Sequence, residues 1–105
     1  MSRQVSEILE DALSHFEMTL RHARRDLDDQ LVIDAVCMRL SAGIEALATL
    51  DSSVREDLFG ADWRLMWGMR NRIAHGYLLV DVDIVRRTVE RDVPLIVARI
   101  QNRTA

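Results

Sequence analysis

Residues that break helices and form turns are scarce in this sequence, which holds one proline and four glycines in 105 residues. Such a chain has little room for the many turns that short β-strands require. Apolar residues instead recur at steps of three and four along most of the sequence, which is the spacing of one face of an α-helix. The sequence therefore predicts a few long helices that pack against one another.

The first half of the chain is expected to hold two long helices and one short one. The first helix is predicted over residues 5–23, and Asp29 is suited to cap the second. Ser53 and Glu56 have the spacing of a capping box and predict a short helix, which Gly60 is suited to end. The apolar stripe of the second helix consists of Ile33, Val36, Leu40, Ile44 and Leu47.

Two more long helices are expected in the second half. Asp62 is suited to cap one of them, and Gly76 suits the position just past its end. The last helix is predicted to start at residues 81–83 and to run toward Arg103. Pro94 lies inside it and should kink or restart it, because proline lacks the backbone N–H and clashes one turn back. The sum is an all-α up-and-down bundle of four long helices plus a short helix.

The length of the chain predicts one domain over residues 1–105, and chains this short often gain stability by pairing, so a homodimer is expected. The single cysteine, Cys37, cannot form an internal disulfide, which fits a reducing cytoplasm. No basic-then-apolar leader and no run of membrane-spanning length is seen. These features predict a cytoplasmic protein without a membrane partner.

The formal net charge of −3 means that bulk charge will not attract nucleic acid, so DNA is not an expected partner and RNA binding would need a local basic patch. The sequence has no glycine-rich phosphate loop and no Cys/His cluster with zinc spacing. His15 and His22 lie seven residues apart and would share a metal only across a dimer. We therefore expect no metal and no cofactor.

One stretch combines polar, chemically able side chains with an apolar surrounding: "WGMRNRIAHGYLL", residues 67–79. On an ideal helix Arg70 and Tyr77 would share a face, and His75 would lie off it. A helix that ends near Gly76 would free His75 and Tyr77 to approach Arg70. The structural alternative stays open at this point, because a histidine and a tyrosine near a helix end often only satisfy carbonyl groups and fill a groove. Two tryptophans and five methionines are most simply filler of the core or of an interface.

The same residue types suit RNA cleavage without a metal. That reaction needs a base for the 2′-hydroxyl, an acid for the leaving 5′-oxygen and positive charge on the phosphate. Histidine, the residue type at position 75, is suited to either proton transfer, and an arginine such as Arg70 holds phosphate in a fixed fork. The hydroxyl of Tyr77 can donate to phosphate and its ring can stack on a base. A two-fold dimer would bring two such histidines into one cleft.

The spacing of Arg70, four residues, His75, one residue and Tyr77 resembles the motif of the HEPN superfamily, specifically of the HepT-like toxins (the DUF86 family). The resemblance extends to "DAVCMRLSAGIEAL", "WRLMWGMRNRIAHGY" and "VDVDIVRRTVERDVPLI", which look like the second, the motif-bearing and the last helix of that family. It covers most of the chain, and it implies a HEPN-like bundle that dimerises.

This resemblance also implies a function. HepT-like proteins are regarded as metal-independent endoribonucleases that act as toxins, each paired with a minimal nucleotidyltransferase as antitoxin. Carried over, Arg70 would bind the scissile phosphate, His75 would be the general acid and base, and Asn71 would orient phosphate or histidine. Tyr77 would be the residue to which the antitoxin attaches AMP, which blocks the cleft.

Two further expectations follow. Arg72, Arg86 and Arg87 are candidates for a local RNA-binding patch, although each is equally compatible with an ordinary solvated helix residue. An alternative function is a binding partner and AMPylation target of a nucleotidyltransferase, modified at Tyr77 and without nuclease activity of its own.

Overall fold

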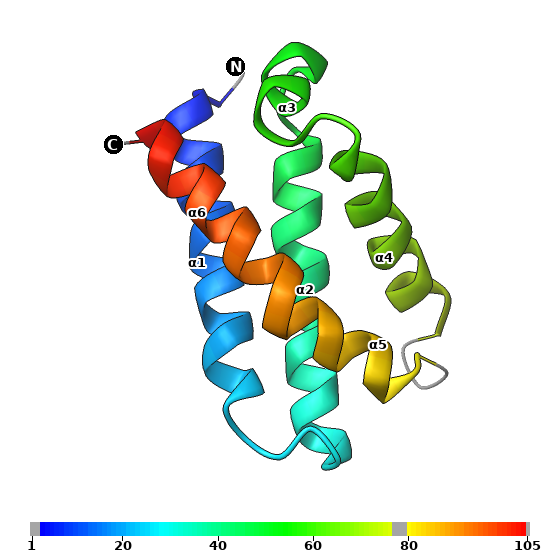
Figure 1. Cartoon of the computed structure of the whole chain (residues 1–105). Coiled ribbons are helices and arrows are strands. Elements are labelled where there is room, and N and C mark those ends of the chain that lie inside the picture. The colour runs from blue at the N-terminus through cyan, green and yellow to red at the C-terminus, as the bar shows by residue number, and fades with distance from the viewer. Residues whose placement is uncertain (1–2, 77–79, 105) are drawn as a thin grey trace.

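The computed structural model of the chain describes residues 3–76 and 80–104, and this part is helical without any strand (Figure 1). Three of the long helices are single α-helices, and the fourth is a continuous C-terminal run with a π-helical turn, η2, in its middle. The predicted all-α bundle of four long helices plus a short one is therefore confirmed. The elements are α1 Val5–Ala23, α2 Gln30–Ala48, α3 Ser52–Phe59, α4 Asp62–Gly76, α5 Val82–Arg87, η2 Thr88–Asp92 and α6 Val93–Thr104.

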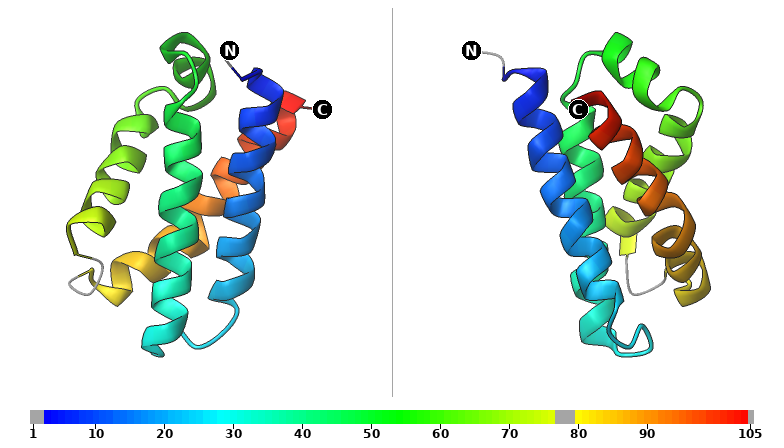
Figure 2. Two further views of the ribbon diagram at one scale, coloured as in Figure 1. Left: turned by 180° about the vertical axis from the view of Figure 1, so that it is seen from behind. Right: turned by 60° about the vertical axis from the view of Figure 1, so that its left-hand side comes forward.

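Helix α2 is central to the bundle. It runs antiparallel to α1 and lies between α1 and α4, and the run from α5 to α6 crosses diagonally over α1 and α2 (Figures 1 and 2). The five residues of its predicted apolar stripe are all buried. They meet apolar residues from the other helices in a core that includes Leu9, Phe16, Val85, Val93 and Ile100.

Helices α1 and α2 approach each other closely in this core. A Cβ atom built on Gly43 would lie 2.7 Å from Cε1 of Phe16, closer than real Cβ contacts come. The Phe16 ring is completely buried and has no free space to retreat into. Glycine at position 43 therefore sets the spacing of the two longest single helices.

Side-chain caps begin two of the helices as predicted. Asp29 accepts a hydrogen bond of 2.9 Å from the backbone N–H of Leu31, and Asp81 accepts one of 2.8 Å from Asp83. Asp62 is different, because it is the first residue of α4 and its carboxylate pairs with Nη1 of Arg99 on α6 at 2.9 Å. It thus places negative charge in the first turn, where the helix dipole favours it, and links two helices.

The short helix α3 ends as predicted but begins differently. Gly60 closes it with a φ of 54°, the left-handed region that glycine adopts without strain. The predicted capping box at Ser53 and Glu56 is wrong. The backbone N–H of Arg55 already bonds to the carbonyl of Asp51 at 3.1 Å, so the first turn starts at Asp51 and Ser53 lies inside the helix.

The last helix runs on past Pro94, where a kink or restart was expected, and the π-turn shows how. Within η2, the backbone N–H of Val93 donates to the carbonyl of Thr88, five residues back. One extra residue is thereby taken into the helical turn directly before the proline. The helix continues as α6 without needing the N–H that Pro94 lacks.

Arg55 of α3 closes the C-terminal end of α2. Its Nη1 donates to the carbonyls of Leu50 at 3.0 Å and Ala48 at 3.3 Å, and its Cζ lies 4.8 Å from the centre of the Trp63 ring. We expect Arg55→Ala to lower the free energy of unfolding by about 1–3 kcal/mol, because the last carbonyl of α2 and the carbonyl of Leu50 just after it lose a charged donor. Urea unfolding measures this. Arg64→Ala, an exposed arginine of α4, is the control and should stay within about 0.5 kcal/mol of wild type. Equal loss in the two variants would contradict the role of Arg55.

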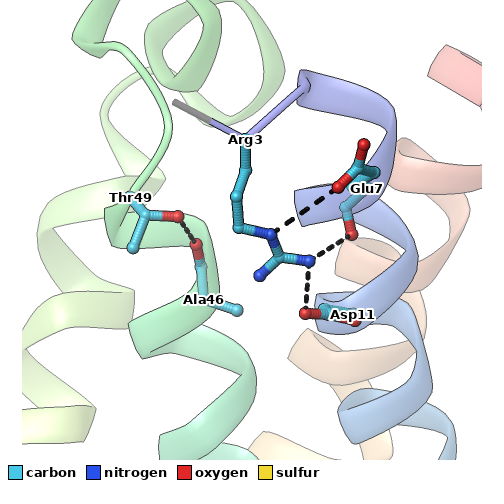
Figure 3. A network of polar contacts seen from close by, with 5 residues as sticks. All are labelled: Arg3, Glu7, Asp11, Ala46 and Thr49. Atoms are coloured by element: carbon cyan, nitrogen blue, oxygen red, sulfur yellow. Dashed lines mark hydrogen bonds and ion pairs between the residues drawn. The ribbon is translucent and has the colours of Figure 1, made fainter. Parts of the chain in front are cut away.

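The N-terminal end of α1 carries a surface network around Arg3 (Figure 3). Its guanidinium pairs with Asp11 at 2.6 Å and more loosely with Glu7 at 3.9 Å, and all three side chains are at least half exposed. Exposed pairs of this kind add little to stability.

None of the helices in the described residues is long and apolar enough to span a membrane.

Candidate functional site

Helix α4 carries Arg70, Asn71, Arg72 and His75, and it includes Gly76 as its last residue. The prediction that Gly76 lies just past the helix end is therefore off by one residue. His75 keeps a helical position about 140° around the axis from Arg70, instead of turning toward it. Tyr77 lies outside the described residues.

Arg70 is held on three sides. Its Nε and Nη2 donate to the same oxygen of Glu45 on α2, Oε1, at 2.9 and 2.7 Å. Its Nη1 donates to Oδ1 of Asn71 at 3.2 Å, and its Cζ lies 4.9 Å from the centre of the Trp67 ring. The guanidinium is thus fixed by an ion pair, an amide and an aromatic face, and the side chain is still 28% exposed.

The two tryptophans are more than filler. The rings of Trp63 and Trp67 stack with their centroids 5.9 Å apart, and the ring centroids of Phe59 and Trp63 are 6.5 Å apart. Arg55 lies over the ring of Trp63, and Arg70 lies over the ring of Trp67. The stack therefore connects the closing contact of α2 to the candidate phosphate-binding arginine.

His75 belongs to a different surface. It is exposed and lines an open hollow together with Asn71, Arg72 and Gly76 of α4 and with Val80, Asp81 and Ile84 at the start of α5. Arg70 does not line this hollow. Asn71 belongs to both places, since it accepts from Arg70 and lines the hollow of His75. Within one protomer, Asn71 is thus the link between the two sides of the motif.

The three arginines suggested as an RNA patch are not brought together. Arg72 lines the hollow of His75, whereas Arg86 lines another hollow with Arg24 and Arg25. Arg86 also faces Asp28 at 3.8 Å, and Arg87 is exposed. Of the three, Arg72 is the one that lines the hollow of His75.

The described residues contain no group of three or more His, Cys, Asp or Glu side chains placed to hold a metal ion. His15 is engaged instead in a contact between α1 and α2, with its Nδ1 3.2 Å from Nη1 of Arg39.

Burial, and secondarily the charge of Asp34, raises the pKa of the Cys37 thiol to about 11. Cys37 is therefore a protonated, unreactive thiol at neutral pH.

The sequence assigned no role to Glu45 and only the role of filler to Trp67, although these two residues fix Arg70. Glu45 had a visible signal, because it is a charged residue on a helix whose neighbouring positions are apolar. Trp67 lies three residues before Arg70 on the same helix, which places the two side chains on one face.

The comparison with known protein families gives one match. The sequence profile described as "HepT-like: Ribonuclease HepT-like" matches residues 5–102, from the start of α1 almost to the end of α6. Among solved protein structures, none matches this chain. Since the matched region holds nearly the whole bundle together with the candidate site on α4, the chain belongs to the HepT-like ribonuclease family.

Proposed function

We propose that this protein is a metal-independent endoribonuclease that acts as the toxin of a toxin–antitoxin pair. The observation that carries the proposal is an arginine fixed at three points, Arg70, on the same helix as an exposed histidine, His75, with Asn71 connecting them. Membership of a family described as ribonucleases supports the same reaction class.

In the proposed reaction the 2′-oxygen of a ribose attacks the adjacent phosphorus, and the bond to the 5′-oxygen breaks. The products are a 2′,3′-cyclic phosphate and a 5′-hydroxyl end. The imidazole of His75 takes the proton from the 2′-hydroxyl or gives one to the 5′-oxygen, and Arg70 stabilises the charge that builds on the phosphate. Asn71 orients the phosphate or the histidine.

The proposed active unit is a homodimer, because one protomer has only one motif histidine and turns Arg70 away from it. Leu65, Gly68, Arg72 and His75 follow one another at steps of three and four on the outward side of α4. Leu65 is 74% exposed, and nothing lies within 4 Å of a Cβ built on Gly68. A second α4 helix packed on this side, with the two-fold axis close to His75, would place two His75 side chains in one cleft, one as base and one as acid.

The antitoxin in this proposal is a minimal nucleotidyltransferase that attaches AMP to Tyr77. The tyrosine is two residues from His75 in sequence, so the added phosphate would compete for the positive charge of Arg70 and Arg72. The separation of Arg70 from His75 within the protomer favours the second candidate, a modification target without nuclease activity. Co-expression with such a partner followed by intact-mass measurement tests the modification, and the mass added should be absent in Tyr77→Phe.

RNA cleavage in the presence of EDTA tests the proposed activity. We expect wild-type protein to cleave and to leave 2′,3′-cyclic phosphate ends, and we expect His75→Ala to be slower by about 10²–10⁴-fold, the usual contribution of general acid–base catalysis. His15→Gln is the matched control, because His15 lies on α1 in contact with Arg39. Cleavage by His75→Ala at the wild-type rate would rule out the mechanism. No cleavage by folded, unmodified wild type would favour the modification target.

A further inference from the structure

The contacts of Arg70 leave a defined part of its guanidinium for a ligand. The group has five N–H bonds, one on Nε and two on each terminal nitrogen. Glu45 accepts one from Nε and one from Nη2, and Asn71 accepts one from Nη1. One N–H on each terminal nitrogen is therefore not used by these contacts. Two oxygens of a phosphate group are acceptors suited to such a pair of donors.

We infer that Glu45 and Trp67 are positioning residues, which hold Arg70 so that these two N–H bonds meet the phosphate of the RNA substrate. The inference rests on the proposed ribonuclease function. Glu45 fixes the guanidinium from α2 and Trp67 supports one face from α4, so the position of Arg70 is determined by two different helices. Neither residue touches the substrate in this proposal.

A contribution to stability or to RNA affinity does not explain Glu45. In the ion pair, the side chain of Arg70 is 28% exposed and that of Glu45 is 49% exposed. Ion pairs exposed to this extent add little to folding stability. A carboxylate 2.7 Å from the phosphate-binding arginine repels an anionic substrate, so it weakens RNA binding rather than strengthening it. The remaining role of Glu45 is to orient the guanidinium of Arg70. Correct orientation lowers the barrier of the chemical step and leaves the dissociation constant of the RNA unchanged.

Removal of the Glu45 carboxylate should therefore lower the catalytic constant without weakening RNA binding. Glu45→Ala should lower kcat by about tenfold or more, because misplacement of a reacting group carries losses of that size. Its Kd for an RNA with a 2′-deoxy substitution at the cleavage site should be equal to or lower than that of wild type. Glu45→Gln keeps an acceptor oxygen for Nε and Nη2 and should retain kcat within about threefold of wild type. Glu10→Ala, an exposed glutamate on α1, serves as control for loss of negative charge.

Trp67 gives a second, independent pair of variants. Trp67→Phe keeps an aromatic face under Arg70 and should retain most of kcat, whereas Trp67→Leu removes the face and should lower kcat with little change in Kd. A kcat of Glu45→Ala within about twofold of wild type would overturn the inference. So would an equal loss in Glu45→Gln and Glu45→Ala, because rescue by the amide is what distinguishes orientation from charge.

An NMR measurement keeps this inference separate from the proposed function. The Nε–Hε signal of Arg70, assigned by its absence in Arg70→Lys, should exchange slowly with solvent in wild type. It should exchange fast in Glu45→Ala and slowly in Glu45→Gln. Fast exchange in wild type would refute the positioning contact, whatever the cleavage assay shows. Slow exchange in a wild-type protein that does not cleave RNA would leave the contact in place, refute the proposed ribonuclease and end the catalytic role assigned to Glu45.

Discussion

Phe16→Ala should lower the free energy of unfolding by about 3–5 kcal/mol, the range observed when a buried phenylalanine is truncated. The Phe16 ring is completely buried and lies against Gly43 of α2, so its removal leaves a cavity in the core. For a domain of this size each kcal/mol shifts the melting temperature by roughly 4 °C or more, so we expect a drop of more than about 12 °C. Differential scanning calorimetry measures both quantities.

The same contact predicts a change of sign at Gly43. In the wild-type background Gly43→Ala should destabilise by about 1–3 kcal/mol, because the new methyl group would lie 2.7 Å from the Phe16 ring. In the Phe16→Ala background the methyl group enters the cavity, and Gly43→Ala should then stabilise by up to about 1 kcal/mol through helix propensity and partial filling.

Gly68 provides the matched control for this double-mutant cycle. It also lies inside a helix, but nothing is within 4 Å of a Cβ built there. At protein concentrations where the protomer is monomeric, so that the proposed dimer face around Gly68 is free, Gly68→Ala should therefore stabilise each background by about 0.5–1 kcal/mol, as expected for glycine in a helix interior. A destabilisation by Gly43→Ala that is the same in both backgrounds would show that the Phe16 ring is not the cause.

Most of the fold could be predicted because its determinants are local. Apolar residues at helical spacing defined α1 and α2, and the caps at Asp29 and Asp81 are side-chain contacts over two residues. The remaining errors also have local causes. The first turn of α3 starts at Asp51, since that carbonyl is already bonded to Arg55, and two serines in a row make the sequence ambiguous there. The π-turn lies directly before Pro94, which lacks a backbone N–H, and apolar periodicity does not show such a local change of the helix.

The candidate site was predictable only in part. Residue types on one predicted helix drew attention to Arg70 and His75, and the resemblance to HepT-like toxins assigned their roles. Glu45 lies 25 positions earlier, and its contact with Arg70 exists only because α2 and α4 pack side by side. A helix pattern gives the face on which a charged residue lies, but it does not give the register of that helix against its neighbour.

Arg70→Lys should lower kcat/KM for RNA cleavage by about 10²–10³-fold, the range measured when a preorganised donor to a developing oxyanion is lost. The positive charge is kept, so the loss would come from geometry. The guanidinium of Arg70 contacts Glu45 along one edge and Asn71 from another nitrogen, and it still has donors for two phosphate oxygens. The ammonium group of lysine presents all its donors from a single nitrogen, so it cannot make these contacts at the same time. The carboxylate of Glu45 would instead draw the ammonium into a simple ion pair, away from the substrate.

The comparison that decides this prediction is among Arg70→Lys, Arg70→Ala and Arg64→Lys, with Arg64 as an exposed arginine of the same helix. We expect the first two to be almost equally slow, because charge without the guanidinium geometry gives little rate enhancement, and the third to match wild type. Retention of more than about a third of kcat/KM in Arg70→Lys would mean that Arg70 acts as a point charge. Glu45 would then be only a counterion of Arg70 and would not orient its guanidinium.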